Sequence, residues 1–319
     1  MPVTSPRRIA VASRSFSRHP ILRTELIARF PEASITFNDD GVSLAGVALV
    51  DFLKGHDGIV TALERLDETV LMALRPELKV VSKYGVGLDM IDLNALRRLG
   101  IRLGWTGGVN RRSVTELVIS CAIALLRHVP RGNLEIRAGH FRQLMGRHLS
   151  NRAVGIIGCG HIGKDLAPIL RHAFGCPVLA HDILDFPEFY AAHGVEPVGL
   201  DELLARADIV TLHLPLDATT RDILSADKLA LMRPGAILIN AARGGLVDEQ
   251  AVKAMLMDGR LGGAAFDVFD PEPPVDHDLL ALPNFLATPH IGGSAEEAVL
   301  AMGRAAIDGL AADTVPEAG

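Results

Sequence analysis

The chain has 319 residues, a formal net charge of −6, 49% hydrophobic residues and only 4% aromatic residues. This length is typical of about two domains, and the composition supplies a large core built mainly from aliphatic side chains. The negative charge gives no electrostatic basis for binding nucleic acid or an anionic membrane, and no apolar run reaches the roughly 18 residues of a transmembrane helix. The three cysteines, Cys121, Cys159 and Cys176, show no disulfide or metal spacing. We therefore expect no metal site and a reducing, cytoplasmic location.

Short apolar strands alternate with longer helical segments along the whole chain, which predicts a parallel α/β architecture. In the first 105 residues we expect helices at 21–30 and 67–74. The strands expected there cover residues 8–13, 34–37, 58–62, 78–85 and 101–105.

Residues 113–129 then form one long apolar segment without an internal Gly or Pro. It predicts a helix capped by Ser113, with Glu116 at the capping-box position three residues later. Because the segment is apolar on nearly all sides, it should be buried on most faces. An interdomain or intersubunit position and burial within one domain both remain open.

The following region begins with a strand at 153–158, a helix at 161–174 and a strand at 177–182. A final helix is expected at 294–312. Between them, strands are predicted at 208–214, 236–242, 262–268 and 285–290.

Gly158, Gly160 and Gly163 form a Gly-x-Gly-x-x-Gly sequence between a strand and a helix. Such glycines allow a tight turn, close approach of a pyrophosphate to the backbone, and packing of the helix on the strand. Asp182 follows at the end of the next strand, 19 residues after Gly163. A carboxylate there binds ribose hydroxyls and repels a 2′-phosphate, so the pattern favours NAD over NADP. Alternatively, Asp182 caps the turn that follows it.

Three polar residues further along make most sense as one chemical site. Arg243 follows a strand and precedes two glycines, which suits a two-pronged contact with a carboxylate. His290 follows another strand, and histidine is the usual proton donor and acceptor near neutral pH. Glu272 would bind the far ring nitrogen and fix the tautomer of His290. A nucleotide fingerprint upstream of these residues suggests a hydride-transferring enzyme.

The order and the amino-acid sequences of these segments resemble those of the D-isomer-specific 2-hydroxyacid dehydrogenase family, in particular its phosphoglycerate dehydrogenase-like branch. The segments are VGIIGCGHIG, LAHD, LINAARGGLVDE, FDVFDPEPP and ATPHIGGS, and the similarity is strongest over residues 79–298. The resemblance implies hydride transfer between NAD and C2 of a small 2-hydroxy or 2-keto acid. Arg243 would then hold the substrate carboxylate, and His290 with Glu272 would handle the proton.

The resemblance also implies two parallel-sheet domains, Rossmann-like and flavodoxin-like. Residues 1–107, completed by 291–319, would form a discontinuous substrate-side domain. Residues 108–290 would form the NAD-binding Rossmann domain. A homodimer would assemble through the cofactor domains and their long helix.

Two groups of site residues are carried over from the family. The cofactor group comprises Gly158, Gly160, His161, Ile162, Gly163, Asp182, Leu214, Pro215, Ala241, Arg243, Asp267, His290 and Gly292. The substrate group comprises Lys83, Gly85, Val86, Gly87 and Asn110. Glycines in the second group expose N–H groups that can cradle a carboxylate, although a plain tight turn is the alternative. For Asp267, the family role is a contact with the nicotinamide carboxamide, and turn capping is the alternative.

One departure concerns the substrate. The phosphoglycerate branch commonly has an arginine after the strand at 58–62, where this chain has Thr61 and Ala62. We therefore expect better activity on hydroxypyruvate or glyoxylate than on 3-phosphohydroxypyruvate, unless Arg65, Lys83 or an arginine from elsewhere supplies the charge. D-3-phosphoglycerate dehydrogenase proper stays an alternative. An alternative of another class is a corepressor-like binding protein that senses NADH.

Overall fold

The computed structural model describes residues 5–312 and 314–316. By its contacts the chain divides into two compact units. Unit 1 comprises Met1–Asn110 with Glu296–Gly319, and unit 2 comprises Arg111–Ala295. The division thus comes after Asn110 and after Ala295, near the boundaries expected after residues 107 and 290.

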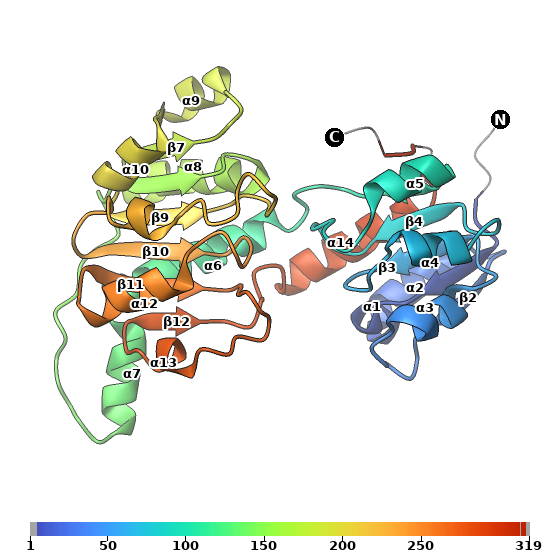
Figure 1. The fold of residues 1–319 in the computed structure, drawn as a ribbon, viewed down its shortest axis with the longest axis horizontal. Coiled ribbons are helices and arrows are strands. Elements are labelled where there is room, and N and C mark those ends of the chain that lie inside the picture. The colour runs from blue at the N-terminus through green and yellow to red at the C-terminus, as the bar shows by residue number, and fades with distance from the viewer. Residues whose placement is uncertain (1–4, 313, 317–319) are drawn as a thin grey trace. The chain divides into compact units, whose positions relative to one another are not determined.

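Unit 1 contains a five-stranded sheet in the order β2-β1-β3-β4-β5 (Figure 1). Every neighbouring pair is parallel, and this is the strand order of flavodoxin-like folds. The central strands β3 and β4 are buried along their whole length, as expected for a parallel sheet covered on both faces. The strands are β1 (Arg8–Val11), β2 (Ser34–Phe37), β3 (Gly58–Thr61), β4 (Val80–Lys83) and β5 (Arg102–Gly104).

Helices cover both faces of this sheet, each with its own apolar cluster. The helices α3 (Gly46–Leu53), α4 (Glu68–Ala73) and α5 (Leu93–Leu99) bury leucines and other aliphatic side chains on one face. The other face is covered by α1 (Arg14–Arg18), α2 (Pro20–Arg29) and α14 (Glu296–Gly309).

The C-terminal helix α14 returns to unit 1 because small residues let it approach the sheet closely. A Cβ on Gly104 would lie only 2.1 Å from the carbonyl oxygen of Gly309, so neither position has room for a side chain. The Ser82 hydroxyl in β4 donates to the carbonyl oxygen of Ala306 at 2.6 Å. These contacts join segments more than 200 residues apart and place α14 against the sheet of unit 1.

Unit 2 contains a seven-stranded parallel sheet in the order β12-β11-β10-β9-β6-β7-β8. This is the Rossmann order with one further strand, β12, at an edge. The edge strand β8 was not expected, because it is short and two of its three residues are exposed. The strands are β6 (Val154–Ile157), β7 (Val178–His181), β8 (Val195–Pro197), β9 (Ile209–Leu212), β10 (Ala236–Asn240), β11 (Leu261–Phe266) and β12 (Phe285–Ala287).

Two helix layers enclose this second sheet (Figure 1). One face packs against α6 (Arg111–Leu126), α8 (His161–Phe174) and α9 (Pro187–His193). The opposite face packs against α10 (Leu200–Arg206), α11 (Ala226–Leu229), α12 (Glu249–Met257) and α13 (His277–Leu280). A further helix, α7 (Val129–Arg137), buries none of its residues.

The prediction for the long helix was wrong at both ends. Helix α6 begins at Arg111, so Ser113 lies inside its first turn and is not the cap. The Ser113 hydroxyl instead donates to the carbonyl oxygen of Gly292 at 2.6 Å. At the other end the helix stops at Leu126, because His128 adopts a left-handed conformation with φ 55°. Helix α6 packs on α8, β10 and β11, which agrees with burial within one domain.

No single helix of the described residues has the length and composition needed to cross a membrane. Helices α6 and α7 pass that test only as a pair, and the pair is bent by 60°.

Candidate active site

The glycine fingerprint lies in unit 2 between β6 and α8, and its three glycines have three different surroundings. Gly158 has φ +94°, and a Cβ there would lie 2.6 Å from the carbonyl oxygen of His213. A Cβ on Gly163 would lie 2.5 Å from the carbonyl oxygen of Gly158. Around Gly160, by contrast, nothing lies within 4 Å of the Cβ position. The first and third glycines therefore allow close packing, and the second leaves open space beside the backbone.

Helix α8 begins at this open space with free donors. Its N-cap is Gly160, no side chain caps it, and no acidic residue lies in the first turn. The first backbone N–H groups, at His161 and Ile162, lack acceptors within the helix, and the helix dipole adds positive potential there. An anionic phosphate group fits this arrangement.

Asp182, at the end of β7, binds the fingerprint loop as well as its own turn. One carboxylate oxygen accepts from the N–H of Cys159 at 2.6 Å, and the other accepts from the N–H of Leu184 at 2.9 Å. The turn-capping contact is thus present, and it fixes the carboxylate next to the glycine loop. The two residues that follow, Ile183 and Leu184, carry no charge and are exposed. The ammonium group of Lys164 lies over the Phe186 ring, 3.3 Å from its centroid.

The end of β9 lies against the same loop. Leu214 is half-buried, and its side chain would be 2.9 Å from a Cβ on Gly158. Pro215, also expected in the cofactor group, is exposed. Nε2 of the His213 ring is hydrogen-bonded to the Thr211 hydroxyl at 3.0 Å. The other ring nitrogen, Nδ1, is buried and has no partner among the described residues. Burial lowers the pKa of His213 to about 3, so this ring is neutral at physiological pH.

Arg243 lies in the turn after β10, directly after the half-buried Ala241 and the buried Ala242. Asn240 shapes this turn, since its side chain donates to the carbonyl oxygen of Arg243 at 2.8 Å and accepts from the N–H of Ala242 at 3.1 Å. Gly244 lets the turn approach the next segment, because a Cβ there would lie 2.0 Å from the carbonyl oxygen of Phe269. Arg243 is thereby held on the loop that neighbours the segment leading to Glu272.

Glu272 and His290 are brought together as the sequence suggested. One Glu272 oxygen lies 2.9 Å from Nδ1 of His290, and the other accepts from the N–H of Phe269 at 3.1 Å. His290 has φ 54°, an uncommon backbone conformation for a residue with a side chain. Its Nε2 makes no hydrogen bond within the described chain, and half of the side chain is exposed. The ring therefore presents one oriented nitrogen to solvent or to a ligand.

Asp267 holds the turn that carries His290. This carboxylate is buried with 4% exposure. One oxygen accepts from the Thr288 hydroxyl at 2.6 Å and from the N–H of Ile291 at 2.8 Å, and the other accepts from the N–H of Gly292 at 2.7 Å. A carboxylate offers about four acceptor positions, so one remains for a ligand. Asp267 therefore does cap the turn, and its remaining acceptor position could still bind a nicotinamide carboxamide.

The expected substrate loop lies in unit 1, after β4. Gly85, with φ +128°, makes a turn that an L side chain rarely adopts. The N–H groups of Gly85, Val86 and Gly87 donate to no acceptor in the described residues. The carbonyl oxygen of Val86 accepts from the Trp105 indole at 2.9 Å. Lys83 is buried, and its ammonium group donates to the carbonyl oxygen of Ala62. The loop therefore has three consecutive backbone N–H groups that are available to a ligand.

Asn110 is the last residue of unit 1 before the chain enters unit 2. Its side-chain oxygen is buried and has no hydrogen-bond partner in the described part of the chain. Leaving such an acceptor unpaired costs about 1 to 3 kcal/mol, so a ligand donor would be favourable there.

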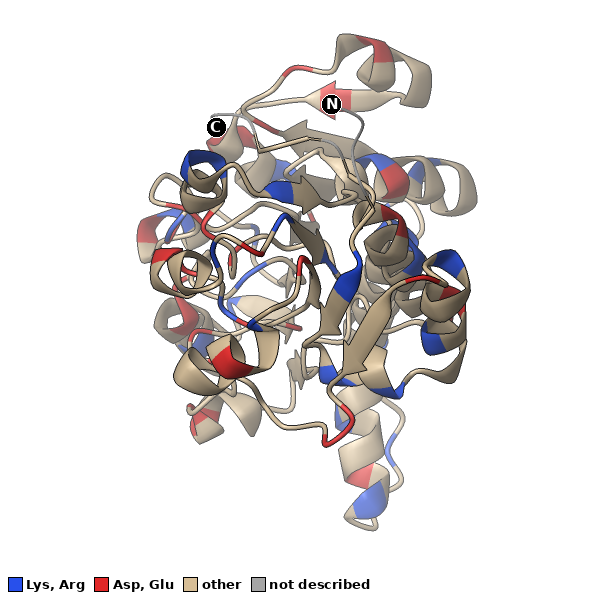
Figure 2. Ribbon diagram, turned by 90° about the vertical axis from the view of Figure 1, so that its right-hand side faces the viewer, with Lys and Arg blue, Asp and Glu red and all other residues tan. Residues whose placement is uncertain are grey.

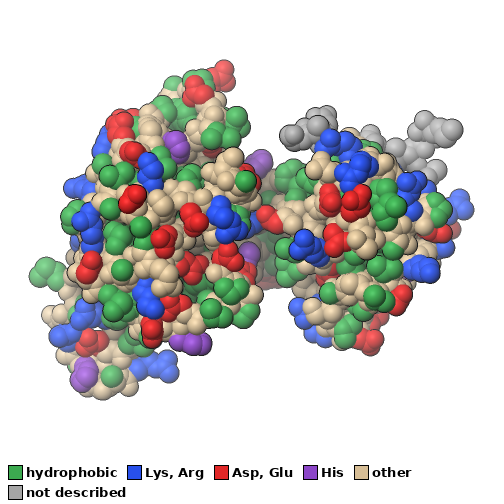
Figure 3. Space-filling model, in the orientation of Figure 1, with side chains coloured by type: hydrophobic (Ala, Val, Ile, Leu, Met, Phe, Trp, Pro, Cys, Tyr) green, Lys and Arg blue, Asp and Glu red, His purple; other side chains and the backbone are tan. Residues whose placement is uncertain are grey.

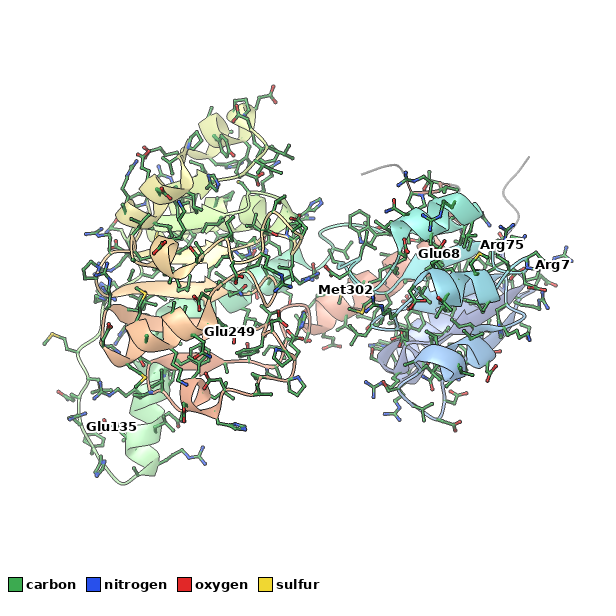
Figure 4. The ribbon with its side chains drawn as sticks, in the orientation of Figure 1. Arg7, Glu68, Arg75, Glu135, Glu249 and Met302 are labelled. Atoms are coloured by element: carbon green, nitrogen blue, oxygen red, sulfur yellow. The ribbon has the colours of Figure 1, made fainter. Side chains whose placement is uncertain are left out.

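Sequence reasoning missed three residues that support this site. Ser113 binds the carbonyl oxygen of Gly292, and Thr288 binds Asp267. Glu249, at the start of α12 (Figure 4), accepts from the N–H of Asp270 at 3.3 Å and so supports the segment before Glu272. Burial raises the pKa of Glu249. Only Thr288 carried a sequence signal, since it lies two residues before His290 at a strand end.

Charges of both signs are interspersed over the ribbon and over the face shown in the space-filling view (Figures 2 and 3). No group of three His, Cys, Asp or Glu side chains in residues 5–312 or 314–316 is arranged to hold a metal ion.

Comparison with known proteins identifies unit 2. The family model for "D-isomer specific 2-hydroxyacid dehydrogenase, NAD binding domain" matches residues 119–292. The chain is 39% identical over 230 residues to D-3-phosphoglycerate dehydrogenase of Methanocaldococcus jannaschii, a match that covers 71% of this chain and 44% of that protein. It is 37% identical over 230 residues to hydroxypyruvate reductase of Thermotoga maritima, covering 69% of this chain and 72% of that protein.

The first of these relatives is much longer than the region matched, since this chain spans less than half of its length. Among solved structures, the TT0316 protein from Thermus thermophilus superposes with a TM-score of 0.81 and 33% identity, covering 95% of this chain and 94% of that one. The chain therefore belongs to the D-isomer-specific 2-hydroxyacid dehydrogenase family, and its unit 2 is the NAD-binding domain of that family.

Proposed function

We propose that this protein is an NAD-dependent D-2-hydroxyacid dehydrogenase acting on a small 2-hydroxy or 2-keto acid. The observation that carries the proposal is the His290 ring, bound through Nδ1 to Glu272 at 2.9 Å with Nε2 left without a partner in the described chain. An alcohol can lose hydride only if a base takes its hydroxyl proton, and ketone reduction needs the matching acid. A corepressor-like sensor of NADH would not need this arrangement.

The residues that would hold NAD fit its chemistry. The open space at Gly160 and the free N–H groups of His161 and Ile162 suit the pyrophosphate. Asp182 suits the adenosine ribose hydroxyls, and Asp267 with one free acceptor position suits the carboxamide N–H. The remaining members of the proposed cofactor group are Gly158, Gly163, Leu214, Pro215, Ala241, Arg243, His290 and Gly292. When bound, NAD supplies or accepts the hydride.

His290 would move the proton at the substrate C2 oxygen. In reduction, the imidazolium donates its Nε2 proton to the developing alkoxide, and in oxidation the neutral ring accepts the hydroxyl proton. Glu272 keeps Nδ1 protonated and stabilises the imidazolium. The turn of His290 is held by Asp267, whose contacts fix the direction of the ring.

Arg243 would bind the substrate carboxylate with its guanidinium fork. In unit 1, the N–H groups of Gly85, Val86 and Gly87 are proposed as substrate-binding donors suited to a carboxylate. Lys83 would support that loop, and the unpaired oxygen of Asn110 would accept a hydrogen bond from a ligand.

A homodimer is also proposed, on the basis of apolar exposure in unit 2. Helix α7 and the loop that follows it extend away from the sheet (Figure 1). Phe141 and Met145 are 90% and 94% exposed, and Val129, Leu134 and Ile136 are each more than half exposed. Such a run of exposed apolar residues is typical of an interface. A Phe141→Ser, Met145→Ser double variant should elute as a monomer in light-scattering chromatography, whereas Met257→Ser, exposed on α12, should not.

A cytoplasmic location is proposed from the cysteines. All three, Cys121, Cys159 and Cys176, are free and buried, which is typical of proteins from reducing compartments. Burial raises the pKa of Cys121 and Cys159 to about 11, so these thiols are packing groups rather than nucleophiles.

The decisive experiment is a panel of short 2-keto acids with NADH, followed at the nicotinamide absorbance, with chiral analysis of the product. We expect oxidation of NADH with at least one acid and formation of its D-2-hydroxy product. Tight NADH binding without turnover of any acid would instead support the sensor alternative.

A further inference from the structure

A cavity of about 350 Å³ lies wholly within unit 1, at the carboxyl ends of three neighbouring strands. Its walls come from the segments that follow β1, β2 and β3, including Arg14, Arg18, Ser15 and Ser43. Ligands in open parallel sheets bind at this edge of the sheet. Two arginines and two exposed hydroxyl groups give the cavity the composition of an anion site.

The two arginines have no partners of their own. Neither the Arg14 nor the Arg18 guanidinium makes a hydrogen bond or ion pair with residues 5–312 or 314–316. Some other arginines of unit 1 are paired, as Arg23 is with Asp39 and Arg304 is with Glu25. Each guanidinium group has five N–H donors, so the two unpaired groups together offer ten donors to a ligand in the cavity.

The wall that carries Ser43 is fixed by a buried amide. Asn38 is only 2% exposed, and its side chain donates to the carbonyl oxygens of Ala12 and Val42, both at 2.9 Å. Arg18 lies directly over Gly41, because a Cβ at that glycine would be 1.9 Å from a guanidinium nitrogen. The loop after β2 is thus tied to the end of β1, and the absence of a side chain at Gly41 makes room for Arg18.

Glu64 is the acidic residue among those lining the cavity, and it does not cancel the positive charge. Its carboxylate accepts from the Thr61 hydroxyl at 3.0 Å and from the N–H of Ala62 at 2.7 Å. It therefore closes the turn after β3. Two guanidinium groups against one carboxylate leave a net positive wall.

The cavity adjoins the loop proposed to hold the substrate carboxylate. Lys83, just before that loop, donates to the carbonyl oxygen of Ala62 in the cavity wall. Tyr84 is hydrogen-bonded to Ser15, another lining residue, and its ring packs edge-on against Phe16 with centroids 5.4 Å apart. Gly85, Val86 and Gly87 follow directly. Two sites for negative groups therefore lie side by side in one unit.

We propose that this cavity binds a second anionic group of the substrate, a phosphate or a carboxylate on the far side of the 2-keto acid. The inference rests on the proposed function and names its substrate class. Arg14 and Arg18 supply, from the segment after β1, the charge that is absent from Thr61 and Ala62. A phosphate in this cavity would reverse the preference expected from the sequence for an unphosphorylated acid, whereas a distal carboxylate would leave that preference standing.

The test uses matched pairs of acids with NADH as the reductant. 3-Phosphohydroxypyruvate is compared with hydroxypyruvate, and 2-oxoglutarate with 2-oxopentanoate, so that each pair differs chiefly in the distal anion. We expect kcat/KM to be at least about tenfold higher for the dianionic member of one pair, since a charge-assisted contact contributes about that factor or more. A preference within the hydroxypyruvate pair indicates a phosphate site, and a preference within the 2-oxoglutarate pair indicates a carboxylate site.

Arg14→Gln and Arg18→Gln should each lower that specificity ratio about tenfold or more, mainly through KM. Arg65→Gln is the control, because it removes the same charge from an exposed residue that does not line the cavity. An unchanged ratio in both cavity variants, or an equal fall in the control, would overturn the subsite while hydroxypyruvate reduction still upheld the proposed function. Failure to reduce any of the four acids would contradict the proposed function and the inference built on it.

Discussion

Replacing Asp267 with Asn should weaken both the stability of unit 2 and turnover, because this carboxylate accepts three hydrogen bonds from the turn that carries His290. An amide retains one acceptor oxygen and presents an NH₂ group in place of the other. If that oxygen keeps Thr288 and Ile291, the NH₂ group faces the N–H of Gly292, and two donors then oppose each other in a buried place.

The magnitude follows from these contacts. A buried unpaired N–H costs about 1 to 3 kcal/mol, and each of the two retained bonds loses roughly 0.5 to 1 kcal/mol when its acceptor becomes neutral. The sum is about 3 kcal/mol of unfolding free energy. For a domain of this size, that lowers Tm by about 6 to 12 °C. Relaxation of the φ 54° conformation at His290 should also lower kcat.

The assay is thermal unfolding followed by circular dichroism without cofactor, together with kcat and the Kd for NADH. Asp278→Asn is the control, because its side chain is 88% exposed in the same unit. Unfolding of Asp267→Asn within about 1 °C of the parent protein would contradict this role of Asp267, since a carboxylate that organised the turn could not be neutralised at so small a cost.

Three further predictions concern cofactor choice, substrate binding and acid stability. The kcat/KM with NADH should exceed that with NADPH by at least about tenfold, and Asp182→Ser should lower this ratio. Equal kcat/KM with both cofactors in the parent protein would contradict the role of Asp182. Arg243→Lys should lower kcat/KM despite retaining the charge, because an ammonium group cannot make the two-pronged contact, and unchanged kinetics would argue against a carboxylate clamp. Because the pKa of His213 is about 3 in the folded state and 6.5 for an unperturbed histidine, the unfolded chain binds the extra proton between these values. Stability should therefore fall as pH decreases below about 6.5, by up to about 1.4 kcal/mol per pH unit, and His213→Asn should flatten that slope in urea titrations.

Local patterns predicted much of unit 2 because their physical causes are local. The helix expected at 161–174 is confirmed as α8, since a glycine turn starts it and Gly175 in the left-handed conformation ends it. The Glu272 contact with His290 is present because both residues follow strands whose carboxyl ends lie at one edge of the sheet. Short edge elements such as β8 lack an apolar pattern, and the sequence did not reveal them.

Long-range contacts explain the failures. Ser113 has every local feature of a helix cap, yet its hydroxyl binds Gly292, 179 residues away along the chain. The return of α14 to unit 1 depends on contacts with β4 and β5 that no local periodicity encodes. Likewise, Arg14 and Arg18 belong to no motif, and only folding places them beside the segments after β2 and β3.

The most direct test of the proposed reaction is a single-turnover experiment with the best 2-keto acid of the panel and NADH that carries deuterium at both hydrogen positions of nicotinamide C4. Mass spectrometry of the product then shows whether the label reaches C2. We expect one deuterium at C2 with the parent protein, and with His290→Ala a rate at least about a hundredfold lower while NADH still binds. Product without label at C2, or an undiminished rate in the His290 variant, would contradict the account.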